Sequence, residues 1–207
     1  MEQAILYFKE KPYLLLILAA LIVLAVWSWM KAGKAAAKRQ KENAALLKKM
    51  DEDTALMREF LELTAEKAEN AEPEKLVKGV ALGLCRRIEK AADIQKEFDT
   101  FTGAQKQIYA LYFVFEDGGK ALSAFFKANG QPLTGCAKAA VTAFYPGEGA
   151  EVFEKEYLAY DEDDETTSLI PADITEQDAA FLRFIENNDV WSAPADYIKA
   201  NLADFLN

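Results

Sequence analysis

The sequence predicts an all-α protein with a single N-terminal transmembrane helix, a helical stalk and a compact domain of six or seven short helices. Three observations lead to this fold class. Residues 13–30 carry no charge, and residues 31–71 are rich in strong helix formers. Beyond Pro73, apolar residues recur at helical spacing between Pro, Gly and Asn breaks. Because no long stretch alternates apolar with polar residues, the sequence predicts no sheet.

The stretch Tyr13–Met30 has the length and composition of a membrane-spanning helix. Ten of its eighteen residues are Leu, Ile or Val. At 1.5 Å per residue the helix would be about 27 Å long, close to the thickness of a bilayer's hydrocarbon core. Trp27 and Trp29 lie near one end, as in the aromatic belts of membrane proteins. We therefore expect residues 13–30 to anchor the chain in a lipid bilayer rather than to form a buried core helix.

Positive charge is unequal across this segment, which predicts its orientation. Two lysines precede it and are balanced by two glutamates, whereas five basic residues follow it closely: Lys31, Lys34, Lys38, Arg39 and Lys41. The positive-inside rule then places residues 1–12 as a short extracytoplasmic tail and the rest of the chain in the cytoplasm. A cleaved signal peptide, cut at residues 35–37, is the alternative. It is disfavoured because the tail is not basic and the segment ends in bulky residues.

Residues 31–72 are predicted to form a basic helical stalk that packs in part on the domain. From Leu46 onward, apolar residues return in steps of three and four, and the stripe runs Leu47, Met50, Thr54, Met57, Leu61. Two interpretations of this stripe stay open. It packs against the chain's own domain, which we favour, or it forms a homodimer through a coiled coil. Thr54 in the seam and the shortness of the run weigh against the coiled coil.

Residues 73–207 are predicted to form an acidic, all-α globular domain. Pro73 suits the first turn of a helix, and Thr102-Gly-Ala-Gln105 matches a capping box. Glycine and asparagine pairs end the following helices. The predicted helices begin at Pro73, at Asp99 or Thr102, at Ala121, at Thr134, at Ala150, at Asp173 or Thr175, and at Ser192 or Pro194, with residues 161–168 as a loop.

Catalytic chemistry has little support in the sequence. The chain has no histidine, which excludes Ser-His and Cys-His nucleophilic sites and histidine metal sites. Cys85 and Cys136 are the only cysteines and form no CxxC pair, so we expect two small buried thiols in a reducing compartment. Residues 86–87 form an isolated basic pair, which we expect to make ion pairs on a helix. We predict no catalytic residue, no metal site and no cofactor.

Negative charge is concentrated in the last third of the chain. Residues 146–207 hold 16 Asp and Glu against 3 Lys and Arg, whereas residues 73–145 hold 7 against 10. The densest acidic stretch, and the predicted partner-binding site, is Asp161, Glu162, Asp163, Asp164 and Glu165. It does not match a calcium-binding EF-hand loop, since Thr166 and Ala172 replace the required Gly and Glu. A solvated loop and a binding patch for a basic protein remain the two interpretations, and direct binding to nucleic acid is not expected.

Residues 102–207 carry three features in a fixed order. They are Asp117-Gly118-Gly119, then Leu122-Ser-Ala-Phe125-Phe126 with Asn129-Gly130, and finally Tyr197-Ile198-Lys199-Ala200-Asn201 before Asp204-Phe205. This order resembles a bacterial all-α domain family typified by DNA mimic protein 19. Asp117 and Leu122 depart from that family's Asn and aromatic residue, and Lys120 and Ala121 are additional. The resemblance implies an acidic binding module and not an enzyme; it does not imply that this chain imitates DNA.

The sequence therefore predicts a single-pass protein of the bacterial inner membrane, with its N-terminus outside and an acidic protein-interaction module in the cytoplasm. The expected partners are the lipid bilayer, through residues 13–30, and a basic or nucleic-acid-binding protein. Two alternatives stay open. One is an enzyme domain with a metal-dependent site made of carboxylates alone, and the other is a structural coiled-coil membrane protein.

Overall fold

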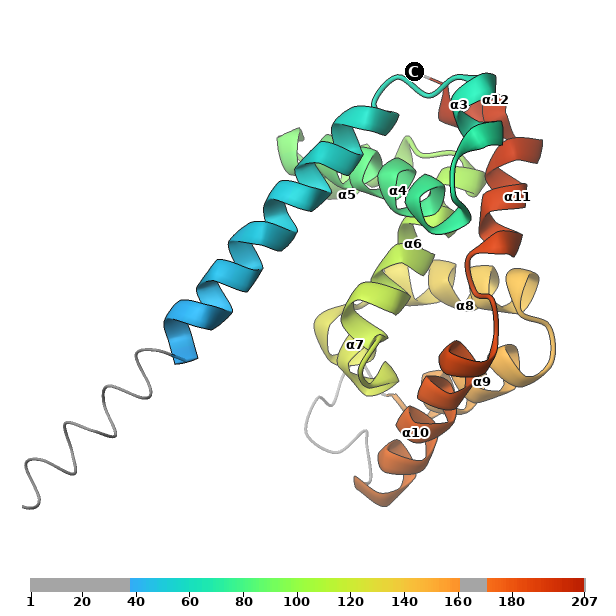
Figure 1. Ribbon diagram of the computed structural model, residues 1–207. Coiled ribbons are helices and arrows are strands. Elements are labelled where there is room, and N and C mark those ends of the chain that lie inside the picture. Colours follow the sequence, from blue (N-terminus) through green and yellow to red (C-terminus); the bar gives the residue numbers. More distant parts are fainter. Residues whose placement is uncertain (1–37, 161–170, 207) are drawn as a thin grey trace, which may run out of the picture. The chain divides into compact units, whose positions relative to one another are not determined.

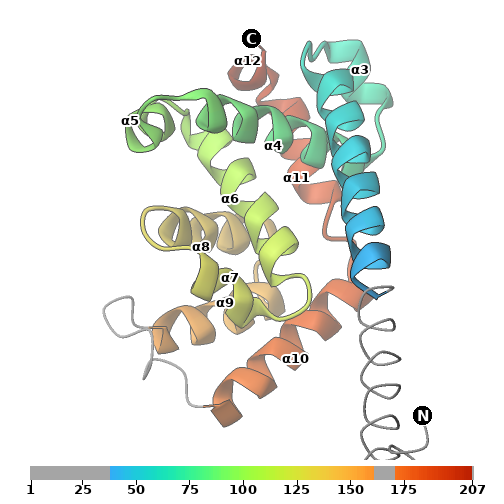
Figure 2. The same ribbon diagram turned by 90° about the vertical axis from the view of Figure 1, so that its left-hand side faces the viewer.

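A computed structural model describes residues 38–160 and 171–206, and within these residues every regular element is a helix (Figures 1 and 2). The predicted all-α class is confirmed for this part of the chain. None of the described helices is long and apolar enough to cross a membrane. The predicted transmembrane segment, residues 13–30, and the predicted site, residues 161–165, both lie outside the described residues.

The chain divides into two compact units, residues 1–52 and residues 53–207. In the first unit, residues 38–52 are helical and exposed. Ion pairs at i, i+4 spacing join Lys38 to Glu42 at 3.8 Å and Lys48 to Glu52 at 3.4 Å. Such exposed pairs add only a few tenths of a kcal/mol each. Residues 38–52 of the stalk therefore form a solvated helix.

In the second unit residues 53–60 are helical, and ten further helices follow within the described residues. They are α3 (Ala65–Asn70), α4 (Pro73–Lys90), α5 (Ile94–Asp99), α6 (Gly103–Gly118), α7 (Leu122–Ala128), α8 (Leu133–Phe144), α9 (Glu148–Ala159), α10 (Pro171–Asn187), α11 (Ser192–Ala200) and α12 (Leu202–Phe205).

Local sequence signals set several of these helix ends as predicted. Pro73 is the first residue of α4. The capping box at the start of α6 is complete, because the Gln105 N–H donates to Thr102 Oγ1 at 3.2 Å and the Thr102 N–H donates to Gln105 Oε1 at 3.1 Å. Helix α6 ends at Gly118. These signals act within three or four residues, which is why they can be read without tertiary information.

The prediction of six or seven helices after residue 72 is wrong, since the described residues there form nine. Helix α5 was missed because it has only six residues, although Asp93 caps it by accepting from the Lys96 N–H at 3.1 Å. The predicted last helix is two helices, α11 and α12, which are separated at Asn201. Short helices leave too few apolar positions for a periodicity to be recognised.

Helix α6 is the central element of the second unit. In both views it runs from the group formed by α3, α4, α5, α11 and α12 to the group formed by α7–α10 (Figures 1 and 2). Its side chains Ile108, Leu111 and Val114 are completely buried. Ile108 belongs to the core around α4 and α11, and Leu111 and Val114 belong to the core around α7–α10. Tyr109 of α6 belongs to a third cluster, with residues of α4 and α5, so α6 contributes to all three parts of the core.

The core of the second unit includes residues that precede Pro73. Phe60, Leu63 and Ala68 are buried against Leu76 and Val77 of α4. Burial of a Phe and a Leu side chain stabilises a fold by about 1.5–3 kcal/mol each. The C-terminal end of the stalk is therefore part of the folded unit.

Candidate binding surfaces

Helices α9 and α10 pack closely because α9 has a glycine at the contact. A Cβ atom on Gly149 would lie 2.8 Å from the Phe184 ring of α10 and 2.8 Å from Tyr145 Cβ. The Tyr145 hydroxyl in turn donates to the backbone oxygen of Val190. These contacts bring the start of α9, the end of α10 and the turn after α10 to one corner of the unit (Figure 1).

Four exposed carboxylates lie on the elements that meet here: Glu148 and Glu151 of α9, Glu186 of α10, and Asp189 in the turn after α10. We call them the acidic corner. Within the described residues no ion pair joins any of them to a cation. Acidic residues in the first turn of α9 are favourable for the helix dipole, but Glu186 in the last turn of α10 is unfavourable for it. Helix stability therefore does not explain the whole cluster.

Asp189 also closes the turn that leads into α11. Its Oδ1 atom accepts from the backbone N–H groups of Trp191 and Ser192 at 3.0 and 3.2 Å, and Oδ2 accepts from the Ser192 hydroxyl. The Ser192 hydroxyl and the two N–H groups hold the pKa of Asp189 below its usual value. The carboxylate therefore stays ionised at neutral pH while its side chain remains exposed.

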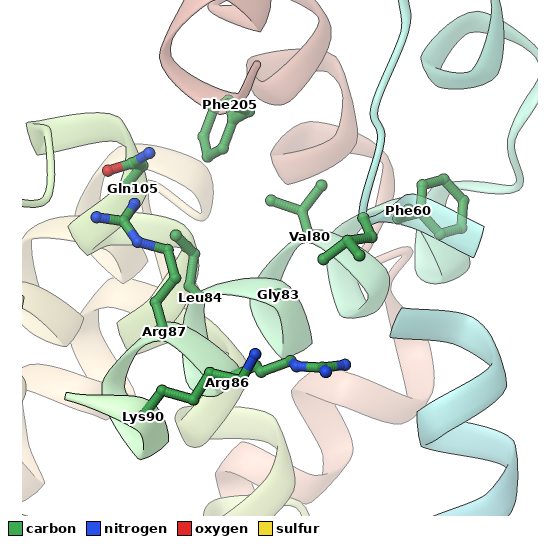
Figure 3. A pocket seen from close by; sticks show the side chains of 10 residues that line it. Phe60, Val80, Gly83, Leu84, Arg86, Arg87, Lys90, Gln105 and Phe205 are labelled. Atoms are coloured by element: carbon green, nitrogen blue, oxygen red, sulfur yellow. The ribbon is translucent and has the colours of Figure 1, made fainter. Parts of the chain in front are cut away.

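A second surface feature is a cavity of about 200 Å³ on α4 (Figure 3). Its walls come from α4, from the first turn of α6, from Phe60 and from Phe205 of α12. Four of its apolar lining residues are buried, namely Val80, Leu84, Phe60 and Phe205, whereas Leu61 is exposed. We call this cavity the α4 pocket.

Three cations of α4 surround the α4 pocket: Arg86, Arg87 and Lys90. Arg87 is already neutralised, since its Nη2 donates to Glu97 Oε1 at 2.8 Å and its guanidinium lies 4.7 Å from the Phe101 ring centre. Arg86 Nη1 donates to Met57 Sδ at 3.7 Å, and within the described residues neither Arg86 nor Lys90 makes an ion pair. The pocket thus combines an apolar floor with two uncompensated positive charges.

The remaining polar groups of the α4 pocket are occupied. Gln105 donates to the backbone oxygen of Asp204 at 2.7 Å through Nε2, and its Oε1 belongs to the capping box. Gly83 lines the wall between the cations and the apolar floor, and a Cβ atom there would meet nothing within 4 Å. The space beside Gly83 is consequently open to a ligand (Figure 3).

A third feature is a carboxyl group inside the fold. Glu156 of α9 is 1% exposed, and among the described residues neither carboxyl oxygen has a hydrogen-bond partner. Burial, together with the nearby charge of Asp178 on α10, raises the pKa of Glu156 to about 8, and Lys127 opposes this shift. Because an unpaired buried charge is very costly, Glu156 is held as the neutral acid at neutral pH.

The expected partner-binding residues, Asp161–Glu165, lie outside the described residues. The described residues contain no group of three or more Cys, Asp or Glu side chains that could hold a metal ion. Burial raises the pKa of Cys85 to about 12, and it raises the pKa of Cys136 as well, so both thiols stay protonated.

Arg86 and Arg87 stand out in the sequence as a basic pair, but the pocket that they border has no sequence signal. The expected ion pair forms for Arg87, and among the described residues none forms for Arg86. Lys90 was missed, although its spacing of four residues from Arg86 indicates the same helix face. Glu156 was missed as well, because an isolated glutamate on a helix carries no sequence signal of burial. Comparisons of this chain with protein-family models, with curated proteins and with solved structures found no match.

Proposed function

We propose that this chain is a membrane-anchored protein-interaction module whose acidic C-terminal third binds a basic protein partner, such as a nucleic-acid-binding protein, in the cytoplasm. The observation that carries this proposal is the acidic corner, four exposed carboxylates with no paired cation in the described part of the chain. Like charges at one corner repel one another. A basic partner would relieve that repulsion.

Electrostatic complementarity of this kind mainly accelerates association. Oppositely charged surfaces steer two proteins toward each other, and exposed charges are screened beyond about 8–10 Å at physiological ionic strength. The acidic stretch 161–165 would add to the negative electrostatic potential of the acidic corner. Binding should therefore be fast at low salt and weaken steeply as salt is added.

The test measures the rate at which a basic probe peptide associates with the full chain in lipid nanodiscs. The probe is a peptide of alternating Lys and Ala residues. The reference is the same peptide with Glu in place of each Lys. The variant Glu148→Gln/Glu151→Gln/Glu186→Gln should slow association with the basic probe several-fold. A charge-matched control removes three exposed glutamates elsewhere, as Glu62→Gln/Glu66→Gln/Glu69→Gln, and should leave the rate nearly unchanged. Equal rates for the two triple variants would show that only net charge matters and would overturn the proposed site.

Neutralising the acidic stretch provides a second arm of the same experiment. Replacing Asp161, Asp163, Asp164 and Glu165 by Asn or Gln should also slow association with the basic probe while the helical circular dichroism signal stays the same. An unchanged association rate would leave this stretch as a solvated loop.

The membrane anchor in this proposal rests on the uncharged residues 13–30 and the basic residues that follow them. A reporter that is active only in the cytoplasm, fused after Asn207, should be active in bacterial cells. Activity of a reporter that works only outside the cytoplasm would reverse the proposed orientation. Recovery of a mature chain beginning near Lys38 would exclude the anchor.

A homodimer through the stalk is a second proposal with its own observation. Three apolar side chains of the stalk are more than half exposed in the single chain: Leu46, Leu47 and Met50. Exposed apolar residues of this kind are expected on a helix that pairs with a second copy in a coiled coil. Light scattering of the full chain in nanodiscs should then report two copies, and Leu47→Lys/Met50→Lys should report one. A single copy for the unsubstituted chain would contradict the dimer.

A further inference from the structure

The α4 pocket has a composition that the proposed acidic interface does not use. It is a basic site on an acidic protein: the chain carries a net charge of −10, yet Arg86 and Lys90 border one cavity and have no carboxylate partner within the described residues. Glu89 of the same helix makes no ion pair with either of them among the described residues. Two adjacent cations without a counter-charge favour an anionic ligand.

The size of the cavity limits what that ligand can be. Pockets that enclose drug-sized molecules or cofactors measure about 300–1,000 Å³, whereas the α4 pocket measures about 200 Å³. It has room for one large apolar side chain above Val80 and Leu84, with the cations at its border (Figure 3). A buried apolar anchor surrounded by polar contacts is the usual arrangement of a protein-binding hot spot.

We propose that the α4 pocket docks a short acidic segment of a second protein partner. One large apolar side chain of that segment, such as Leu or Phe, occupies the space beside Gly83. Carboxylates next to it pair with Arg86 and Lys90. Arg87 does not take part, because Glu97 and Thr100 already hold its guanidinium. The module would thus have two interfaces of opposite charge, one for a basic partner and one for an acidic segment.

Gly83 allows a test that leaves the charges untouched. Because a Cβ atom at this position would meet nothing within 4 Å, Gly83→Leu places a side chain in the cavity without disturbing the core. The same substitution at Gly130, where a Cβ atom also meets nothing within 4 Å, is the matched control. Thermal unfolding followed by circular dichroism should show that Gly83→Leu is at least as stable as the unsubstituted chain.

The experiment measures fluorescence anisotropy of labelled peptides with the full chain in lipid nanodiscs. The first labelled probe is the peptide Glu-Glu-Leu-Phe-Glu-Glu, and the second has Lys in place of each Glu. Dodecanoate is added as an unlabelled competitor of the acidic peptide. The acidic peptide should bind and the lysine peptide should bind at least tenfold more weakly at this site. Gly83→Leu and Arg86→Glu/Lys90→Glu should each weaken binding of the acidic peptide at least tenfold.

Two control variants show whether binding depends on the α4 pocket itself. Gly130→Leu and Lys120→Glu, which changes an exposed lysine outside the pocket, should change the affinity less than twofold. Absence of binding by the acidic peptide, or equal binding to the Gly83→Leu variant, would overturn the proposal. Binding of dodecanoate alone would assign the pocket to acyl anions, and loss of self-association in Gly83→Leu would assign it to a second copy of the chain; either result overturns the proposed partner.

Discussion

Asp178 on α10 caps the start of α7 through Ser123, which lies 55 residues earlier in the sequence. Asp178 Oδ1 accepts from the Ser123 backbone N–H and Oδ2 accepts from the Ser123 hydroxyl, both at 2.8 Å. The N-cap position of α7 is Ala121, which has no side chain able to cap the helix. Helix α10 thus supplies the hydrogen-bond acceptor that α7 lacks, and this joins α7 to α10.

Removing this cap should destabilise the protein. Asp178→Ala leaves the Ser123 N–H and hydroxyl without their acceptor, and loss of a helix cap costs about 0.5–2 kcal/mol. Ser123→Ala should cost less, because its backbone N–H still donates to Asp178. Urea unfolding followed by circular dichroism measures both. If Ser123→Ala lowered the free energy of unfolding more than Asp178→Ala, the Ser123 side chain and not the cap from Asp178 would be the source of the stabilisation.

The buried Glu156 should make stability depend on pH in an unusual direction. Its pKa is about 8 in the folded chain against an ordinary value of 4.5, so between these values the folded state holds a proton that the unfolded state has lost. Its contribution to stability should therefore be greatest below pH 4.5, fall as the pH rises to about 8, and then level off. The total loss should be on the order of 5 kcal/mol, since the two pKa values differ by about 3.5 units and one unit corresponds to about 1.4 kcal/mol.

Glu156→Gln and Glu156→Met should flatten this pH dependence and be more stable than the unsubstituted chain at pH 8. The chain has no histidine, so few other side chains titrate between pH 5 and 8. Glu151→Gln, which changes an exposed glutamate of the same helix, is the control and should keep the slope. The measurement is the free energy of unfolding of each variant at pH 5, 6.5 and 8. If the free energy of Glu156→Gln changed with pH as steeply as that of the unsubstituted chain, Glu156 would not be the group that titrates.

Two glycines of α4 should respond in opposite ways to the same substitution. Gly83→Ala should stabilise the chain by about 0.5–1 kcal/mol, because alanine favours the helix and its Cβ meets nothing within 4 Å. Gly79→Ala should destabilise it, because the new Cβ would lie 2.7 Å from Phe60 Cγ and would overpack the core. Thermal unfolding of the two variants compares them directly. A stabilised Gly79→Ala would mean that Phe60 does not pack on α4 as described.

The packing of Phe60 on α4 predicts where the folded unit begins. A fragment of residues 53–207 should be helical and unfold cooperatively, whereas residues 73–207 lack Phe60, Leu63 and Ala68, which are buried. Loss of a buried Phe alone costs about 3–5 kcal/mol, a large share of the stability of a domain. Differential scanning calorimetry of both fragments checks this, and Phe60→Ala in the longer fragment should reproduce a large part of the loss. Equal stability of the two fragments would contradict it.

The sequence by itself determined the helical class of the described residues and the ends of several helices. Pro73, the Thr102–Gln105 capping box and Gly118 act through the backbone within one helical turn, so their effect does not depend on the rest of the fold. Helices α5 and α12 were not predicted, since six and four residues give too little periodicity. The functional prediction at residues 161–165 rests on sequence alone.

Only the tertiary structure decided the environment of individual charges. Glu156 and Glu151 have the same chemistry and lie on the same helix, yet one is buried and the other exposed. Arg86 and Arg87 are adjacent, yet within the part of the chain that the structure describes only Arg87 meets a carboxylate, on the separate helix α5. Such differences depend on which helices pack together, and contacts between residues far apart in the chain arise from the packing of the whole core rather than from local preference.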